Sequence, residues 1–199
     1  MGYIGTKPQV ATTLADNIVT ADKIVSGAVT DAKIAAMAAT KLTGTVPDAN
    51  APSGSVIQVV STSISPGYTA TTSSSYVDSG LSLGITLLSS SSKVLIMVNG
   101  GHAYVASNWS GGMIETICRQ SSTTYASEND LANASFGLTQ IYNSTNLNTC
   151  PHSMHFLHNT PGSTTPTYRV FFKSRDSGDT VVWQEGSSFV SMTLMEIAA

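Results

Sequence analysis

From residue 55 to the C-terminus, short apolar stretches alternate with segments rich in Ser, Thr, Gly and Asn. This spacing predicts about nine short β-strands and no long helix. The alternation is clearest near the end of the chain, where Val190, Met192 and Leu194 fall on one face of a strand. The expected strands are Ser55–Val60, Tyr76–Leu81, Leu83–Leu88, Lys93–Val98, Met113–Arg119, His152–His158, Thr167–Lys173, Thr180–Glu185 and Phe189–Ile197.

The stretch Lys93–Val98, which extends toward Val105, is apolar almost without interruption. A strand with this pattern is covered on both faces. One cover would be the core of its own domain, and the second could be a neighbouring subunit. Strands of this number and length favour a mainly β fold, a β-sandwich or jelly roll, as a head domain over residues 55–199.

Residues 16–46 carry a quasi-repeat of ten residues, in which Thr20–Ile24 is echoed by Thr30–Ile34 and, in shortened form, by Thr40–Leu42. The large apolar residues are Ile18, Ile24, Val29, Ile34 and Leu42. One chain has too few of them to bury itself, so we expect several chains to intertwine into a stalk around these residues. Three chains are expected by analogy with other fibres.

Two alternatives remain open for the stalk. Residues 31–42 are rich in Ala and are compatible with a short helix. The segment is also compatible with a disordered linker. Residues 47–54, with Pro47, Pro52 and Gly54, are expected to form the hinge between stalk and head.

Only 11% of the residues are charged and the net charge is −3, so the chain carries no basic stripe for nucleic acid. No apolar run is long enough to cross a bilayer, and membrane insertion is not expected. Residues 1–8 do not resemble a secretory leader. Cys118 and Cys150 are therefore expected to be free, buried thiols.

The sequence offers little catalytic chemistry. His152, His155 and His158 follow one another at intervals of three, which on a strand places His155 on the opposite face from the other two. One chain cannot close a metal site from them, although a trimer axis could gather three copies of one histidine. They are expected to be surface or loop residues. Glu128 and Asp130 are expected in an exposed loop, so we predict a non-enzymatic protein without a cofactor.

Aromatic side chains in polar segments are the better functional hint. Trp109, Tyr125 and Tyr142 lie among Ser, Asn and Gly residues. Aromatic faces that stack on sugars, beside amides that bond hydroxyl groups, suit contact with a glycan or a protein surface. These three residues are the candidate receptor contacts. Trp183, inside an expected strand, is predicted to lie in the core or an interface.

Several segments resemble tail-fibre and related virion-appendage proteins of tailed bacteriophages. They include the opening Tyr3-Ile4-Gly5 with Pro8 and the Thr-Ala-Asp-Lys-Ile and Thr-Asp-Ala-Lys-Ile repeats. The head landmarks are Val56–Val60, Tyr76–Leu81, Ser92–Ile96, Phe156–His158, Thr167–Val170 and Met195–Ala198.

The resemblance implies a homotrimeric structural protein of the virion, exposed on the particle surface. Residues 1–15, with Tyr3, Ile4 and Pro8, would anchor it to other virion proteins, and the head would face a host glycan or protein. One alternative is a purely architectural decoration or knob protein. Another is a secreted trimeric jelly-roll module of the tumour-necrosis-factor or complement-globular kind.

Overall fold

The computed structural model describes residues 20–30, 51–64, 67–106, 111–143, 149–176, 178–186 and 188–199. The chain divides into two units, Met1–Thr45 and Val46–Ala199. Among the described residues, no helix is long and apolar enough to cross a membrane.

The described part of the first unit contains one turn of 3₁₀ helix, η1 (Ala21–Lys23). Two expected stalk-core residues lie here, and Ile24 and Val29 are 46% and 56% exposed within the single chain. Their neighbour Val25 is 75% exposed. The other expected stalk and anchor residues, Ile18, Ile34, Leu42, Tyr3, Ile4 and Pro8, lie outside the described residues.

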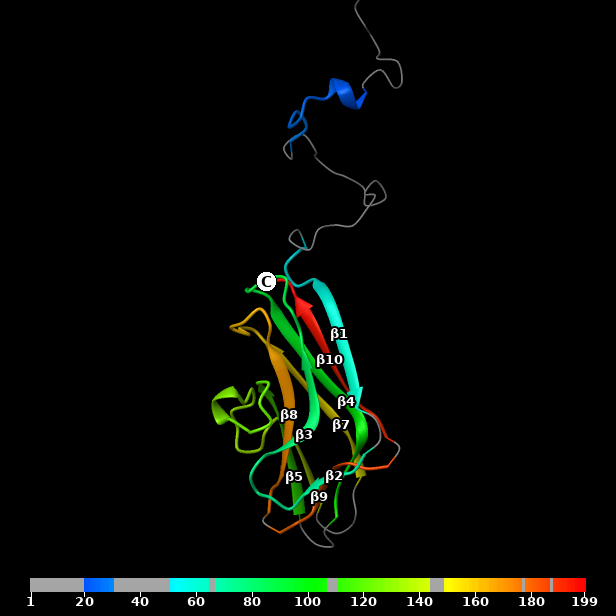
Figure 1. The fold of residues 1–199 in the computed structure, drawn as a ribbon, viewed down its shortest axis with the longest axis vertical. Coiled ribbons are helices and arrows are strands. Elements are labelled where there is room, and N and C mark those ends of the chain that lie inside the picture. Colours follow the sequence, from blue (N-terminus) through cyan, green and yellow to red (C-terminus); the bar gives the residue numbers. More distant parts are fainter. Residues whose placement is uncertain are drawn as a thin grey trace, which may run out of the picture. The chain divides into compact units, whose positions relative to one another are not determined.

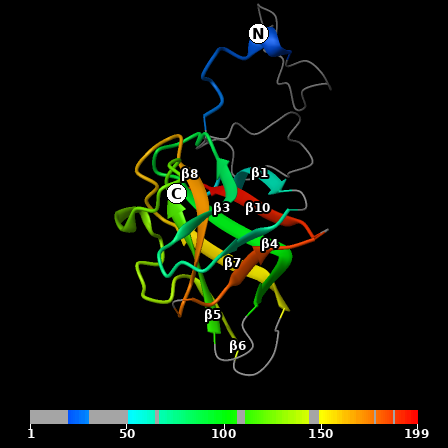
Figure 2. The ribbon, with the colours of Figure 1, turned by 60° about the horizontal axis from the view of Figure 1, so that its bottom comes forward.

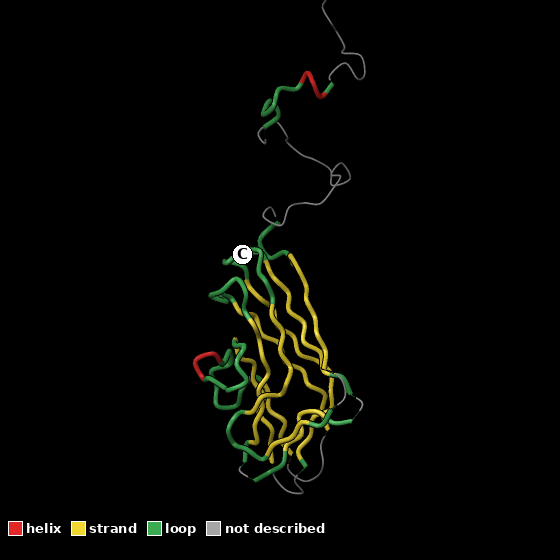
Figure 3. Tube along the Cα trace, viewed as in Figure 1, coloured by secondary structure: helices red, strands yellow, loops and turns green. Residues whose placement is uncertain are grey.

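The second unit consists of two antiparallel β-sheets, which confirms the mainly β prediction (Figures 1 and 3). Sheet A has the order β1–β10–β4–β9–β2, with β7 paired to β4, and sheet B has the order β3–β8–β5–β6. The strands of sheet A are β1 (Val56–Ile64), β2 (Thr69–Thr71), β4 (Lys93–Val105), β7 (Thr149–His158), β9 (Val181–Gln184) and β10 (Val190–Ile197). Those of sheet B are β3 (Val77–Gly84), β5 (Gly111–Arg119), β6 (Thr139–Asn143) and β8 (Thr167–Ser174).

Alternation of apolar side chains builds the core between the sheets. Val190, Met192 and Leu194 of β10 are fully buried, as their spacing predicts. They pack in one cluster with side chains from both sheets, including Tyr168 and Trp183, which are also fully buried. Figure 2 shows β3 and β8 of sheet B lying across β4 and β7 of sheet A.

Three strand predictions need correction. The two strands expected on either side of Gly80 are one strand, β3, whose pairing with β8 shifts between Asp78 and Ser82. Gly80 has a φ of +84°, which lets the strand bulge at this point without breaking. The strands β2 and β6 were not predicted, because both are short and carry mostly polar residues.

The long strand β4 bends where its neighbour changes from β10 to β9. Gly100 and Gly101 have φ values of +95° and +76°. A Cβ on Gly101 would lie 2.7 Å from the His152 ring and would collide with Val190. Glycine is therefore required here, and the space that it leaves is filled by the buried His152.

His152 on β7 and Glu115 on β5 form a buried ion pair that joins the two sheets. The imidazole Nδ1 lies 2.6 Å from Glu115 Oε1, and both side chains are fully buried. The other ring nitrogen, Nε2, lies 2.7 Å from the carbonyl oxygen of Trp183, whose indole stacks against the imidazole. The expectation of a surface histidine is therefore wrong for His152, because its alternation on β7 points it inward.

The environment of His152 favours its charged form. Burial alone would lower its pKa, but the carboxylate of Glu115 and the carbonyl of Trp183 outweigh burial, and the pKa is raised above 6.5. A histidine whose pKa is higher in the folded state stabilises the fold below its unfolded pKa. That contribution disappears as the pH rises through the folded pKa.

We predict that Glu115→Gln lowers the free energy of unfolding by about 3–5 kcal/mol near pH 6, because it leaves a buried charge without its partner. The loss should begin to shrink above about pH 6.5, where the histidine of the unfolded state loses its proton, and the part due to the charged pair should disappear only as the pH rises through the higher folded-state pKa of His152. Urea unfolding over a pH series measures both effects. Glu128→Gln, at an exposed position, is the control and should change stability by less than about 0.5 kcal/mol. A Glu115→Gln loss that is the same at every pH would contradict a charged pair.

Candidate functional site

The connection between β5 and β6, residues 120–138, folds over the outer face of sheet B. It contains the 3₁₀ turn η5 (Ser127–Asn129). Of the nine residues of β5, all but Arg119 are buried, so this strand is covered on both faces. The inner cover is the core, and the outer cover is this connection of the same chain.

Asp130 holds the connection in place. Its carboxylate accepts hydrogen bonds from the Thr116 hydroxyl, the Tyr125 hydroxyl and the amide of Ala132. The amide of Leu131 also donates to the carbonyl of Ile117. Asp130 was expected in an exposed loop, but these donors place it against the sheet, where it acts as a structural anchor.

Gly137 closes the end of the connection. Its φ is +60°, and a Cβ at this position would collide with the carbonyl of Glu115. The next residue, Leu138, donates its amide to that same carbonyl oxygen at 2.8 Å. Only glycine lets the backbone approach β5 this closely.

Strand β8 and Arg175, which directly follows it, present three cationic side chains along this outer surface. Residues 169, 171, 173 and 175 alternate with inward-facing residues, which places Arg169, Phe171, Lys173 and Arg175 on the outer side. We call Arg169, Lys173 and Arg175 the cationic strip. Arg169 is neutralised by Asp78, whose carboxylate lies 2.8 Å from its guanidinium.

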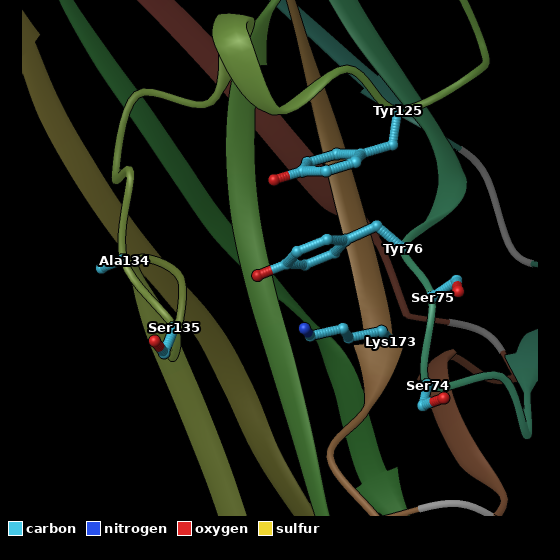
Figure 4. A pocket seen from close by; sticks show the side chains of 7 residues that line it. All are labelled: Ser74, Ser75, Tyr76, Tyr125, Ala134, Ser135 and Lys173. Carbon is cyan, nitrogen blue, oxygen red and sulfur yellow. The ribbon is translucent and has the colours of Figure 1, made fainter.

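Lys173 lies over an aromatic stack beside a shallow pocket (Figure 4). Its ammonium nitrogen is 4.4 Å from the centroid of the Tyr76 ring. The Tyr125 ring covers Tyr76 at a centroid distance of 4.5 Å and meets Phe171 edge-on. The pocket of about 370 Å³ is lined by Ser74, Ser75, Tyr76, Tyr125, Ala134, Ser135 and Lys173.

Arg175 lies between two exposed aromatic rings. Its guanidinium carbon is 4.8 Å from the centroid of Tyr142 and 5.8 Å from that of Phe136. The two aromatic residues are 48% and 54% exposed. Unlike Tyr76, these rings present much of their surface to solvent.

The charge of the strip is only partly compensated. Two ion pairs form among the described residues, His152 with Glu115 and Arg169 with Asp78, so neither Lys173 nor Arg175 pairs with a described carboxylate. Burial raises the pKa of Tyr76, which keeps its hydroxyl neutral beside Lys173. Two cations, exposed rings and nearby serine hydroxyls can together hold an anionic, hydroxyl-rich ligand.

The structure describes two of the three candidate receptor contacts and places them in different environments. Tyr142 is exposed, but it lies in β6 and not in a loop. Tyr125 faces inward across Tyr76, and its hydroxyl is committed to Asp130, so its main role is to hold the connection on the sheet. Trp109 lies outside the described residues.

The three histidines of β7 do not form a common site within the chain. His152 is buried against Glu115, His155 is exposed on the opposite face, and His158 lies 3.1 Å from the Tyr168 hydroxyl. Within the described residues, no three His, Cys, Asp or Glu side chains gather closely enough to hold a metal ion. Both cysteines are free, as expected, with Cys118 buried and Cys150 half-buried.

Sequence reasoning did not identify Tyr76, Phe136, Lys173 or Arg175 as site residues. The available signal was the alternation of cationic and aromatic residues in Arg169-Val170-Phe171-Phe172-Lys173-Ser174-Arg175. Pairing of this outer row with Tyr76 and Phe136 depends on contacts between distant segments, which strand periodicity does not reveal.

We predict that Asp130→Ala loosens the connection, because three donors lose their acceptor. Amide hydrogen exchange in peptides covering residues 126–138 should accelerate at least about tenfold, which corresponds to about 1.4 kcal/mol of local stability. Glu128→Ala, on the exposed turn of the same connection, is the matched control and should leave exchange unchanged. Equal exchange in the wild type and in Asp130→Ala would show that Asp130 is not the anchor.

The comparisons with known proteins assign no ligand to this surface. No protein-family model matches the chain. The search of curated proteins gives no match either. The chemistry of the strip therefore rests on its own residues and their geometry.

Proposed function

We propose that this chain is a non-enzymatic structural appendage of a tailed-bacteriophage particle, a homotrimeric fibre whose head binds a host surface glycan. The N-terminal repeats and the landmarks of the head support the appendage class by resemblance. The exposed apolar residues Ile24, Val25 and Val29 support self-association of the stalk. Residues 1–15 would attach the fibre to other virion proteins.

The observation that carries the binding role is the outer surface formed by the end of β8 and by Arg175, which follows it. Lys173 and Arg175 lie near one another on the same face, without a described carboxylate as partner, and both lie over aromatic rings. Cations of this kind attract acidic groups, while the exposed rings of Phe136 and Tyr142 can stack on the apolar faces of sugars. The ligand class that fits is therefore an acidic surface polysaccharide.

We further propose that the head is a jelly roll. Five strand pairs are nested, since β1 pairs with β10, β2 with β9, β3 with β8, β4 with β7 and β5 with β6. A long hairpin rolled over on itself gives this nesting. The nested order supports the jelly-roll assignment and, with it, a rigid scaffold that presents its loops and its outer sheet surfaces.

One observation favours the purely architectural alternative. Both faces of the Tyr76 ring are occupied within the chain, one by Lys173 and one by Tyr125. This stack can therefore serve to fix the connection without contacting a ligand. In that case the protein would act as a decoration or knob of the particle, and the surface around Arg175 would have no receptor.

We predict that the double variant Lys173→Gln/Arg175→Gln binds acidic host polysaccharide at least about tenfold more weakly, a loss of about 1.4 kcal/mol. Binding of the full chain to purified acidic and neutral surface polysaccharides would be measured by biolayer interferometry at low and physiological salt. The matched control is Lys23→Gln/Lys93→Gln, which removes two positive charges that do not belong to the strip and should bind like the wild type.

Two results would contradict glycan binding by the strip. They are absence of binding to any host polysaccharide or intact envelope, which would favour the architectural role, and equal binding by the two double variants. Cleavage of the polysaccharide by the wild type would instead contradict the non-enzymatic assignment and make the protein an enzyme.

A further inference from the structure

The outer face of sheet A has an apolar row that the described part of the chain leaves partly exposed. Strand register places Val59 of β1 opposite Met195 of β10, Met195 opposite Leu95 of β4, and Leu95 opposite Leu157 of β7. Directly opposed residues lie on the same face of a sheet, so these four side chains form one continuous row. Val59 and Leu157 are 53% and 44% exposed, and the two central residues are half-buried.

The rows on either side define the limits of this apolar patch. Toward one end, Val56 of β1 opposes Ile197 of β10, which in turn opposes Lys93. Toward the other end, the next row contains Met97 and His155, and the row after it is entirely polar, with Ser63, Ser191, Asn99 and Ser153. An apolar centre that grades into a hydroxyl-rich margin is typical of a protein–protein interface.

The exposure of this apolar row distinguishes sheet A from sheet B. The outer face of sheet B is covered by the β5–β6 connection, which is anchored by Asp130. Strand β5 is consequently buried on both faces. Strand β4 has a comparably apolar sequence, yet Leu95 and Met97 on its outer side are covered only in part. The described residues supply no equivalent cover for the outer face of β1, β10, β4 and β7, although β9 of the same sheet is buried along its whole length.

We infer that the outer face of β1, β10, β4 and β7 is a contact surface between copies of this chain. This inference rests on the proposed function only for the existence of an assembly, and it adds the face through which the heads meet. The apolar row Val59–Met195–Leu95–Leu157 would form the centre of the contact. The polar row that ends at Ser153 would form its margin.

The charge of the face fits contact with further copies of this chain. The one acidic residue within these four strands is Glu196, and it is fully buried, accepting hydrogen bonds from Gln58 and from the amides of Leu88 and Ser89. Lys93 lies at one end of the patch. In the proposed trimer, copies of this face can therefore approach one another around the common axis without opposing like charges, and the face lacks the charge needed to attract a strongly charged partner.

The order of the elements along the chain also favours a further copy of this chain as the partner of the outer face of sheet A. β1 is the first strand after the N-terminal repeat, in which Ile24 and Val29 are exposed within one chain. Copies that associate through this repeat carry their heads on short tethers, which greatly raises the local concentration of one head around another. A weak apolar contact between heads then becomes sufficient for their association.

The test is protection of a thiol introduced at the apolar row of the full chain. Leu157→Cys is combined with Cys150→Ser, because the half-buried Cys150 would otherwise react. The control is Thr123→Cys in the same background, at an exposed position on the β5–β6 connection. The rate of reaction with a bulky maleimide is measured under native conditions, and the mass of each sample is measured by light scattering.

We expect the thiol at position 157 to react at least about tenfold more slowly than the thiol at position 123, and Val59→Glu to restore fast reaction by placing a charge in the contact. Fast reaction at position 157 in a sample with the mass of a multimer would overturn the inference and leave the proposed assembly intact. Slow reaction that persists with Val59→Glu would also overturn it, because the protection would then arise within the chain. The mass of a monomer would overturn the proposed assembly itself.

Discussion

A two-layer β-sandwich buries only one face of each sheet, and this constraint governs the rest of the molecule. In sheet B, β5 is buried on both faces, and in sheet A, β4 is apolar on both faces from Val94 to Val98. Each therefore needs a second cover beyond the common core. Sheet B receives it from the chain itself, through the connection that Asp130 holds against β5. The outer face of β1, β10, β4 and β7 in sheet A has no such cover among the described residues, and we infer that other copies of the chain supply it.

The interior is also organised by a polar contact. The His152–Glu115 pair and the stacked Trp183 lie among the large side chains of the core. Such a pair costs desolvation energy, so its main effect is to fix one arrangement of the two sheets. The bend at Gly101 is part of that arrangement, because a larger residue would displace the imidazole ring.

Much of the head could be predicted from local pattern alone. The alternation in β10, the long apolar run of β4 and the burial of Trp183 all follow from side-chain periodicity. The ion pair between Glu115 and His152 could not be predicted in this way. Its partners lie on different strands of different sheets, and periodicity gives the face of a residue without giving its partner. For the same reason Tyr125 was interpreted as a free loop aromatic, whereas it lies between Tyr76 and Phe171.

We propose different roles for the two outer faces. Sheet B offers cations and aromatic rings for ligand binding, and sheet A offers an apolar surface for association between copies. The most direct test of this account is the urea midpoint of the full chain, measured over about a hundredfold range of protein concentration. If the apolar row of sheet A and the repeat are buried between copies, unfolding is coupled to dissociation and the midpoint rises with concentration. A midpoint that does not change with concentration, in a protein that sediments as a monomer, would contradict the account.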